Sequence, residues 1–156
     1  MPGYDEKCSW IVDDLGFDGA INYKSDDLSS KLAELSSNGV DIYFEITGGA
    51  TEHALFDAMN VHARMVVCGM MADYIAEEPS AGPNWIPIVK KRFTIRGFTV
   101  PDHYEEIPAL LEQLAPYVMS GKVKDRSHLL EGLERSTEGL NLFFTGGNRG
   151  KLIVKL

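Results

Sequence analysis

The sequence has 156 residues, enough for one domain with a substantial core, and it carries a formal net charge of −8. Hydrophobic residues make up 44% and charged residues 24%, which is the composition of a globular protein rather than a disordered or fibrous one. The acidic balance argues against a nucleic-acid partner, because binding to a phosphate backbone requires a clustered positive surface.

Cysteine usage and hydropathy indicate a compartment. Cys8 and Cys68 lie far apart in the sequence, and no apolar secretory segment precedes them. This pattern predicts neither a disulfide framework nor export, so we expect a reducing, cytoplasmic location. The apolar runs are all far shorter than the roughly 20 residues that span a bilayer. We therefore expect no membrane role.

The first half of the sequence predicts alternating helices and strands. Apolar residues recur at helical spacing before Gly16, and a β-branched run leads into Gly48-Gly49 as a buried strand enters a tight turn. Ser25 is the predicted N-cap of the second helix. In chain order we expect a helix over 5–15, a strand over 20–24, a helix from 25 to about 39, a strand over 40–47 and a helix from 51 to about 61.

The second half continues the alternation after one interruption. Prolines and glycines between 72 and 87 predict a long loop, a feature that is more often functional than not. The basic run "KKRFTIRG" that follows the loop suggests an edge strand with charged outward positions. In chain order we expect a strand over 64–70, the loop, a strand over 92–100, a helix from about 104 to 122, an irregular stretch over 123–133, a helix over 137–144 and a strand over 151–156.

Strands separated by helices of this length predict right-handed βαβ crossovers and an α/β fold with a doubly wound parallel sheet. Ligands bind such sheets at the carboxyl ends of the strands. The candidate segments are therefore those that follow each strand: "KSDD", "TGGA", "GMMADY" and "PDHY", with the first residues "GYDEK".

Lys7 is the first candidate binding residue. It falls in the first turn of its predicted helix, where the helix macrodipole disfavours a cation by a few tenths of a kcal/mol. A phosphate near this helix start would compensate, and Tyr23 could supply a hydroxyl beside it. The alternative is an ordinary solvated lysine.

Metal and nucleophile chemistry find little support in the sequence. The four histidines form no HExxH pattern and neither cysteine belongs to a CxxC pair, so we expect no metal site. There is no GxSxG motif, and Cys68 falls within the predicted buried strand over 64–70, where a thiol is usually inert.

A series of motifs taken in order resembles one known family. The motifs are "DEKC", "LGFDGAINYK", "VDIYFEITGG", "ARMVVCGMMADY", "GFTV", "EGLE" and "GGNRGKLIVKL". Together they are similar to the medium-chain dehydrogenase/reductase superfamily, and within it to the zinc-independent, NADP-dependent branch of alkenal and prostaglandin or leukotriene reductases. The resemblance covers almost the whole chain.

The resemblance implies a domain organisation. It matches the C-terminal half of such an enzyme, so the catalytic barrel, the first strand and the glycine-rich turn would precede it; no GxGxxG motif or usual variant occurs. We accordingly expect one partial domain over 1–156. Residues 1–115 would be the C-terminal part of a Rossmann-type NADP-binding domain, and 116–156 would be terminal helices and a strand returning toward the barrel.

The resemblance also implies cofactor-binding residues. Lys7 would pair with the 2′-phosphate of NADP, and Tyr23 would lie against the same group. Asn148 would contact the cofactor from the C-terminal segment. Gly69 and Tyr74 would flank the nicotinamide ribose, with Tyr74 as the candidate catalytic residue.

Phe98 and Val100 would contact the nicotinamide through side chain and backbone. Two departures from the family pattern bear on the site. Ile46 stands where the family commonly has Asn, which would remove a polar contact to the cofactor. The family's "CGAIS" reads "CGMMA" here, which would remove a ribose-side hydroxyl at its last position and narrow the pocket with Met70 and Met71.

The activity implied is hydride transfer from NADPH to the β-carbon of an α,β-unsaturated carbonyl compound, an enone or enal, followed by protonation of the enolate. A homodimer would form by pairing of the edge strand from Phe93 to Val100 across a two-fold axis. The parent protein would thus be an enzyme, while the isolated chain would be inactive. The alternative is a non-catalytic dimerising or binding module, because a sheet without its first strand leaves backbone groups to be paired by another chain.

Overall fold

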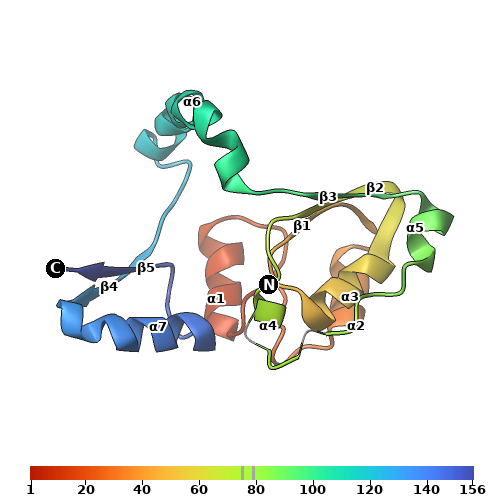
Figure 1. Cartoon of the computed structure of the whole chain (residues 1–156), viewed down its shortest axis with the longest axis horizontal. Helices are drawn as coiled ribbons and strands as arrows, with labels where there is room; N and C mark the ends of the chain where they lie inside the picture. Colours follow the sequence, from red (N-terminus) through yellow and green to blue (C-terminus); the bar gives the residue numbers. More distant parts are fainter. Residues whose placement is uncertain (75, 79) are drawn as a thin grey trace. The chain divides into compact units, whose positions relative to one another are not determined.

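The computed structural model describes residues 1–74, 76–78 and 80–156, which divide into two compact units (Figure 1). Unit 1 comprises Met1–Val12 and Gly16–Tyr104, and unit 2 comprises Asp13–Leu15 and Glu105–Leu156. Both contain helices and a parallel sheet. The predicted α/β class with parallel strands is therefore confirmed, although the described strands form two sheets rather than one.

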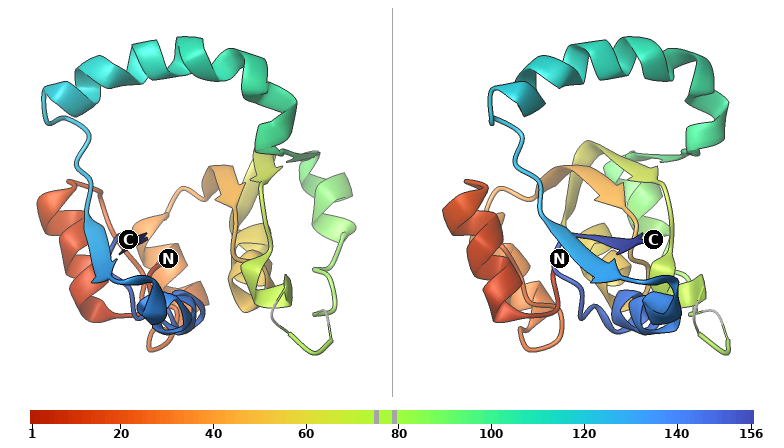
Figure 2. Two further views of the ribbon diagram at one scale, coloured as in Figure 1. Left: turned by 60° about the vertical axis from the view of Figure 1, so that its left-hand side comes forward. Right: turned by 90° about the vertical axis from the view of Figure 1, so that its left-hand side faces the viewer.

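Unit 1 contains a parallel sheet of three strands in the order β1-β2-β3. The strands are β1 (Val40–Glu45), β2 (Met59–Val67) and β3 (Thr94–Gly97). α3 (Gly49–Ala58) connects β1 to β2, and α5 (Ile86–Lys91) precedes β3. Figures 1 and 2 show α3 along one side of this sheet. The carboxyl ends of all three strands therefore share one edge.

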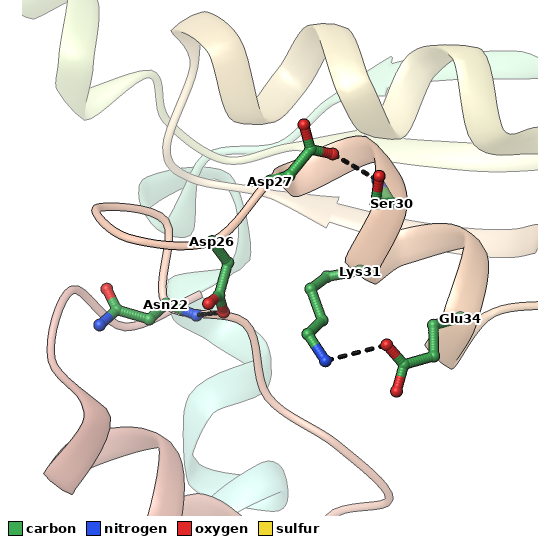
Figure 3. Close-up of polar contacts among 6 residues, drawn as sticks. All are labelled: Asn22, Asp26, Asp27, Ser30, Lys31 and Glu34. Carbon is green, nitrogen blue, oxygen red and sulfur yellow. Dashed lines mark hydrogen bonds and ion pairs between the residues drawn. The ribbon is translucent and has the colours of Figure 1, made fainter.

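The N-terminal segment of unit 1 begins with a helix that changes pitch. α1 (Asp5–Ser9) continues as a π-helix (Trp10–Asp14), and Gly16 ends it with a positive φ of 74°, as the sequence predicts. α2 (Leu28–Leu35) follows, capped by Asp27, whose carboxylate accepts the backbone N–H of Ser30 at 2.7 Å (Figure 3). The cap expected at Ser25 was misplaced, because the N–H groups of Ser25 and Asp26 bond to the carbonyl of Asn22 in a preceding turn.

The strand expected over 20–24 does not form. Its residues run without strand pairing into a turn at Tyr23–Ser25. A strand requires a neighbour to share its ladder, and none of the described strands pairs with this segment. The N–H of Tyr23 instead bonds to the carbonyl of Pro2 at 3.1 Å. The segment is therefore fixed by contacts with the first residues of the chain.

Two further expectations around the loop over 72–87 need correction. α4 (Met71–Tyr74) occupies its start and α5 its end. Lys90 and Lys91 lie in α5 rather than in an edge strand, and Arg92 ends that helix with a φ of 53°. The prolines at 83 and 87 led to the prediction of a loop instead of this short helix. Pro87 is nevertheless compatible with α5, because it lies in the first helical turn.

The core of unit 1 lies between the sheet and its helices. Phe56 of α3 is 1% exposed, and its ring makes edge-to-face contacts with Trp85 at 5.8 Å and Phe93 at 4.9 Å between centroids. Met65 of β2 is equally buried and pairs in register with Tyr43 of β1. The odd-numbered side chains at the end of β1 thus face the core, which places Glu45 inside as well.

Unit 2 is a helix followed by a small βαβ arrangement. After a 3₁₀ segment (Val100–Glu106), α6 (Ile107–Met119) contains Pro116 and has no buried residue. β4 (Ser127–Glu131) lies in the stretch expected to be irregular and pairs in parallel with β5 (Lys151–Lys155). A 3₁₀ turn (Leu133–Arg135) and α7 (Ser136–Thr145) connect the two strands. The missed strand was hidden by its brevity and its polar flanks.

Gly139 allows α7 to lie close to this two-stranded sheet. A Cβ at position 139 would come within 3.1 Å of Leu130, which is 1% exposed. Glycine is therefore used here for close packing between helix and strand.

Among the helices that the structure describes, none is both long and apolar enough to cross a membrane.

The core of unit 1 predicts a large effect of Phe56→Ala. Removing a ring that touches Trp85 and Phe93 leaves a cavity, and we expect the free energy of unfolding to fall by about 3–5 kcal/mol in urea titrations followed by circular dichroism. Phe17→Ala, at a position 61% exposed, is the matched control and should change it by less than about 1 kcal/mol. Equal losses in the two variants would contradict this placement of the core.

Candidate functional site

A cleft lies where β2 and β3 end. It has a volume of about 500 Å³ and is lined by residues 67–70 at the end of β2, residues 97–99 at the end of β3, and the side chains of Tyr74 and Asp102. Three residues that the sequence analysis singled out, Gly69, Tyr74 and Phe98, meet there. Val100 begins the next 3₁₀ segment and is not among the described residues that line the cleft. The cleft is at the edge of the sheet where parallel α/β proteins bind ligands.

Tyr74 is positioned by hydrogen bonds that anchor α4 to the end of β1. The N–H of Met71 bonds to the carbonyl of Ile46 at 2.9 Å, and the N–H of Ala72 to that of Thr47 at 2.8 Å. The Tyr74 ring is 68% exposed, and its Oη would lie 3.8 Å from a Cβ placed on Gly69. The absence of a side chain at Gly69 leaves the space beside the phenol open.

Phe98 is fixed by one contact of its backbone and one contact of its ring. Its N–H bonds to the carbonyl of Val67 at 2.9 Å, which extends the β2–β3 pairing by one residue. Its ring stacks on His103, with centroids 5.0 Å apart and an interplanar angle of 22°. This leaves an apolar ring of fixed orientation in the wall of the cleft.

Cys68 differs from expectation. The sequence analysis placed it within a buried strand, but β2 ends at Val67 and Cys68 is exposed in the lining of the cleft. The N–H of Cys68 bonds to the carbonyl of Glu45, which extends the β1–β2 pairing by one residue beyond the end of β2. Apolar runs do not reveal where a strand ends when the residues beyond it are also apolar.

Glu45 was not singled out from the sequence, yet it organises the turn behind the cleft. Its side chain is 0% exposed and accepts hydrogen bonds from the hydroxyl of Tyr43, the N–H of Thr47 and the N–H of Gly48. Burial, followed by the bond to Glu45, raises the pKa of the Tyr43 phenol. The available signal was alternation: in the strand over 40–47 the side chain of Glu45 faces the same side as Tyr43.

A second buried carboxylate lies nearby on α3. Glu52 is 5% exposed, and burial together with the negative charge of Glu45 raises its pKa. The neighbouring Nε2 atom of His53 is buried and has no hydrogen-bond partner among the described residues. The negative charge of Asp73 in α4 also raises the pKa of Glu52. The Asp73 carboxylate itself accepts hydrogen bonds from the N–H and the hydroxyl of Ser80, at 3.0 and 2.6 Å.

Lys7 and Tyr23, the candidates for phosphate binding, belong to one cluster in unit 1. We define the Tyr4 cluster as Tyr4, Lys7, Tyr23 and Lys24. The ammonium of Lys7 lies 5.4 Å from the centre of the Tyr4 ring, and that of Lys24 lies 4.5 Å from the same centre and 5.9 Å from that of Tyr23. Two cations and two phenols therefore gather where the sequence analysis expected one of each.

Asn22, which sequence reasoning also missed, holds this cluster together. It is 6% exposed; its Nδ2 donates to Asp5 at 2.7 Å and its Oδ1 accepts the N–H of Lys24 at 3.1 Å. Its backbone N–H donates to Asp26 at 2.8 Å (Figure 3). Asn22 thus connects α1 with the turn that carries Tyr23 and Lys24. A polar residue in a run expected to be a strand was the only sequence signal.

Asn148 belongs to unit 2, in the loop between α7 and β5. Its Nδ2 donates to the carbonyl of Gly150 at 2.8 Å, which tightens that loop. The predicted role of Asn148 at the cofactor stays a prediction. Over residues 1–74, 76–78 and 80–156, no three His, Cys, Asp or Glu side chains gather closely enough to hold a metal ion.

Comparisons with known proteins match most of the chain to one family. The family model described as zinc-binding dehydrogenase matches residues 4–116. (+)-Pulegone reductase from Mentha piperita is 35% identical over 153 residues, and the NADP(+)-dependent 2-alkenal reductase of Nicotiana tabacum is 37% identical over 153 residues. Each alignment covers 97% of this chain and 45% of the relative. The chain thus spans about half the length of these curated relatives.

The solved structure of CurA from Vibrio vulnificus in complex with NADPH is similar throughout. It superimposes with a TM-score of 0.90 at 33% sequence identity. The superposition covers 98% of this chain and 47% of CurA. The fold described above therefore corresponds to one half of that protein.

The buried position of Glu52 predicts a pH dependence of stability. Its pKa in the folded protein is raised above the ordinary value of 4.5, so its neutral form is favoured by folding. This contribution is fully present below pH 4.5 and is lost as the pH rises through the raised pKa. We expect Glu52→Gln to be more stable relative to wild type at pH 7 than at pH 4, in urea titrations at each pH. Glu77→Gln, at an exposed position, is the control. A pH-independent difference for Glu52→Gln would contradict the raised pKa.

Proposed function

The chain belongs to the zinc-binding dehydrogenase family, and from this premise we propose that it is the C-terminal part of an NADPH-dependent oxidoreductase that reduces the double bond of α,β-unsaturated carbonyl compounds. The observation that carries the proposal is the cleft at the ends of β2 and β3, where Gly69, Tyr74 and Phe98 meet. The names of the similar reductases, which refer to NADP and to an alkenal or pulegone, support the cofactor and the substrate class.

The residues of the cleft and of the Tyr4 cluster suit the binding of NADP. The cleft has room for an aromatic ring beside Phe98, and the lack of a Cβ at Gly69 leaves space next to the phenol of Tyr74. Lys7 and Tyr23 offer a cation and a hydroxyl to the 2′-phosphate. When bound, NADPH supplies the hydride for the β-carbon of the substrate. Asn148 and the backbone at Val100 complete the proposed set of contacts.

The roles of the cleft residues follow from their chemistry. Phe98, backed by His103, packs its ring against a flat heteroaromatic group and excludes water from one face. Tyr74 is the proposed catalytic residue. Its hydroxyl donates a hydrogen bond to the substrate carbonyl oxygen, where negative charge builds up during the reduction. The exposed ring is free to face a substrate, while α4 holds its backbone through Ile46 and Thr47.

Within this proposal, residues 1–115 contribute the C-terminal part of a Rossmann-type NADP-binding domain, and residues 116–156 contribute the terminal helices and strand. We also propose that the protein acts in the cytoplasm, where its two free cysteines would remain reduced. The small-molecule substrate is an enone or enal.

The second candidate function is a non-catalytic dimerising or binding module. β1 is at one edge of its sheet, and Ile42 and Phe44 on this strand are 63% and 53% exposed. Such a strand offers backbone groups and apolar surface to another chain. Titration with NADPH separates the two candidate functions, because we expect the oxidoreductase part to bind the cofactor and a non-catalytic module not to bind it.

β3 supports the proposed homodimer through Phe93 to Val100. It pairs only with β2 in the described sheet, so its outer side is at the sheet edge. Strand pairing across a two-fold axis would be an isologous contact. We expect sedimentation equilibrium to give about twice the 17.3 kDa chain mass. A single species of one chain mass over a range of concentrations would contradict the dimer.

The cofactor assignment predicts the effect of Lys7→Ala. Removing a cation beside the 2′-phosphate should weaken NADPH binding by about tenfold or more and leave NADH binding nearly unchanged. Calorimetric or fluorescence titrations with both cofactors measure this ratio. Lys90→Ala removes an exposed lysine of α5 as the matched control. An unchanged preference between NADPH and NADH in Lys7→Ala would contradict the assignment.

A further inference from the structure

Lys24 occupies a position equivalent to that of Lys7 in the Tyr4 cluster. Its ammonium lies 4.5 Å from the centre of the Tyr4 ring and 3.5 Å from the Tyr4 hydroxyl. Lys7 approaches the same ring from α1 at 5.4 Å. The two cations come from segments far apart in the sequence, so their convergence is a property of the fold.

The backbone at Lys24 is held by hydrogen bonds, and the Lys24 side chain packs against the N-terminal segment. The Oδ1 atom of Asn22 accepts the Lys24 N–H, and the N–H of Tyr23 bonds to the carbonyl of Pro2. A Cβ on Gly3 would lie 2.9 Å from Lys24 Cε and 2.9 Å from a ring carbon of Tyr23. The chain before α1 therefore packs directly onto these two side chains, and a side chain at position 3 would require them to shift.

This arrangement has the chemistry of a phosphate monoester site. A phosphate monoester carries a charge near −2 at neutral pH and three strong acceptor oxygens. Two ammonium groups beside one ring can both donate to such a group, and charge-assisted hydrogen bonds are the strong ones. The phenols of Tyr4 and Tyr23 are 44% and 42% exposed, so their hydroxyls are accessible for further hydrogen bonds.

We propose that Lys24, with Tyr4, joins Lys7 in holding the 2′-phosphate of the cofactor, and that Lys24 is a residue that determines specificity for NADPH over NADH. This inference rests on the proposed function, because it takes the phosphate to be that of NADP. It adds a second cation at the phosphate, carried by the turn after Tyr23 and oriented by Asn22.

The test uses two nucleotides that differ only in this phosphate. The protein is titrated calorimetrically with adenosine 2′,5′-bisphosphate and with adenosine 5′-monophosphate. Lys24→Met keeps an unbranched stem against Gly3 and removes the charge. We expect it to weaken bisphosphate binding about tenfold and to leave monophosphate binding unchanged, whereas Lys24→Arg retains most of the preference.

Lys31→Met is the matched control. Lys31 is a lysine of α2 that pairs with Glu34 at 2.9 Å (Figure 3), and its loss changes the net charge equally. We expect it to affect neither nucleotide. Thermal unfolding of each variant is recorded, and Lys24→Arg is the variant that separates loss of charge from loss of structure.

Each other outcome overturns the proposal in a recognisable way. If Lys24→Met keeps the preference for the bisphosphate while Lys7→Ala loses it, Lys24 is not a phosphate residue and the proposed function stands. If Lys24→Met weakens both nucleotides equally, or no more than Lys31→Met does, its role is structural or a general charge effect. If wild type shows no preference between the nucleotides, both the inference and the proposed NADP site fail.

Discussion

The buried carboxylate of Glu45 is the contact on which the geometry of the cleft depends. It is fully removed from solvent, and a carboxyl group in that position requires several hydrogen-bond donors to offset its desolvation. Tyr43, Thr47 and Gly48 supply them, which fixes the turn after β1. The carbonyls of Ile46 and Thr47 in the same turn then receive the first N–H groups of α4. The buried Glu45 side chain thus fixes the backbone position from which the exposed Tyr74 side chain extends.

The same turn explains why the departure at Ile46 is compatible with the fold. The interactions that anchor α4 use the backbone carbonyl of residue 46, so they do not depend on its side chain. Ile46 is 47% exposed and leaves the turn geometry to Glu45 and the two glycines. Any consequence of this side chain belongs to ligand contact rather than to folding.

Sequence periodicity predicted the helices and strands that have strong local signals. It missed the features that depend on contacts with residues distant in the sequence. The strand over 40–47 and the helix before Gly16 follow from hydrophobic spacing and glycine placement. The segment over 20–24 has the composition of a strand but lacks a pairing neighbour in the described sheet. Gly69, Tyr74 and Phe98 were predicted from the family resemblance, and they lie together because the ends of parallel strands share an edge. Glu45 and Asn22 were missed because a buried polar residue is recognisable only once its partners are known.

The hydrogen bonds of Asn22 have a consequence for binding energetics. Asn22 joins Asp5 in α1 to the backbone of Lys24, and its own N–H bonds to Asp26. The backbone segments that carry Lys7 and Tyr23 are therefore held in place before any anion arrives. A preorganised pair of segments loses little conformational entropy on association, so more of the electrostatic attraction is retained as affinity. A single uncharged, buried side chain in this way contributes to the selection of a charged ligand that it need not touch.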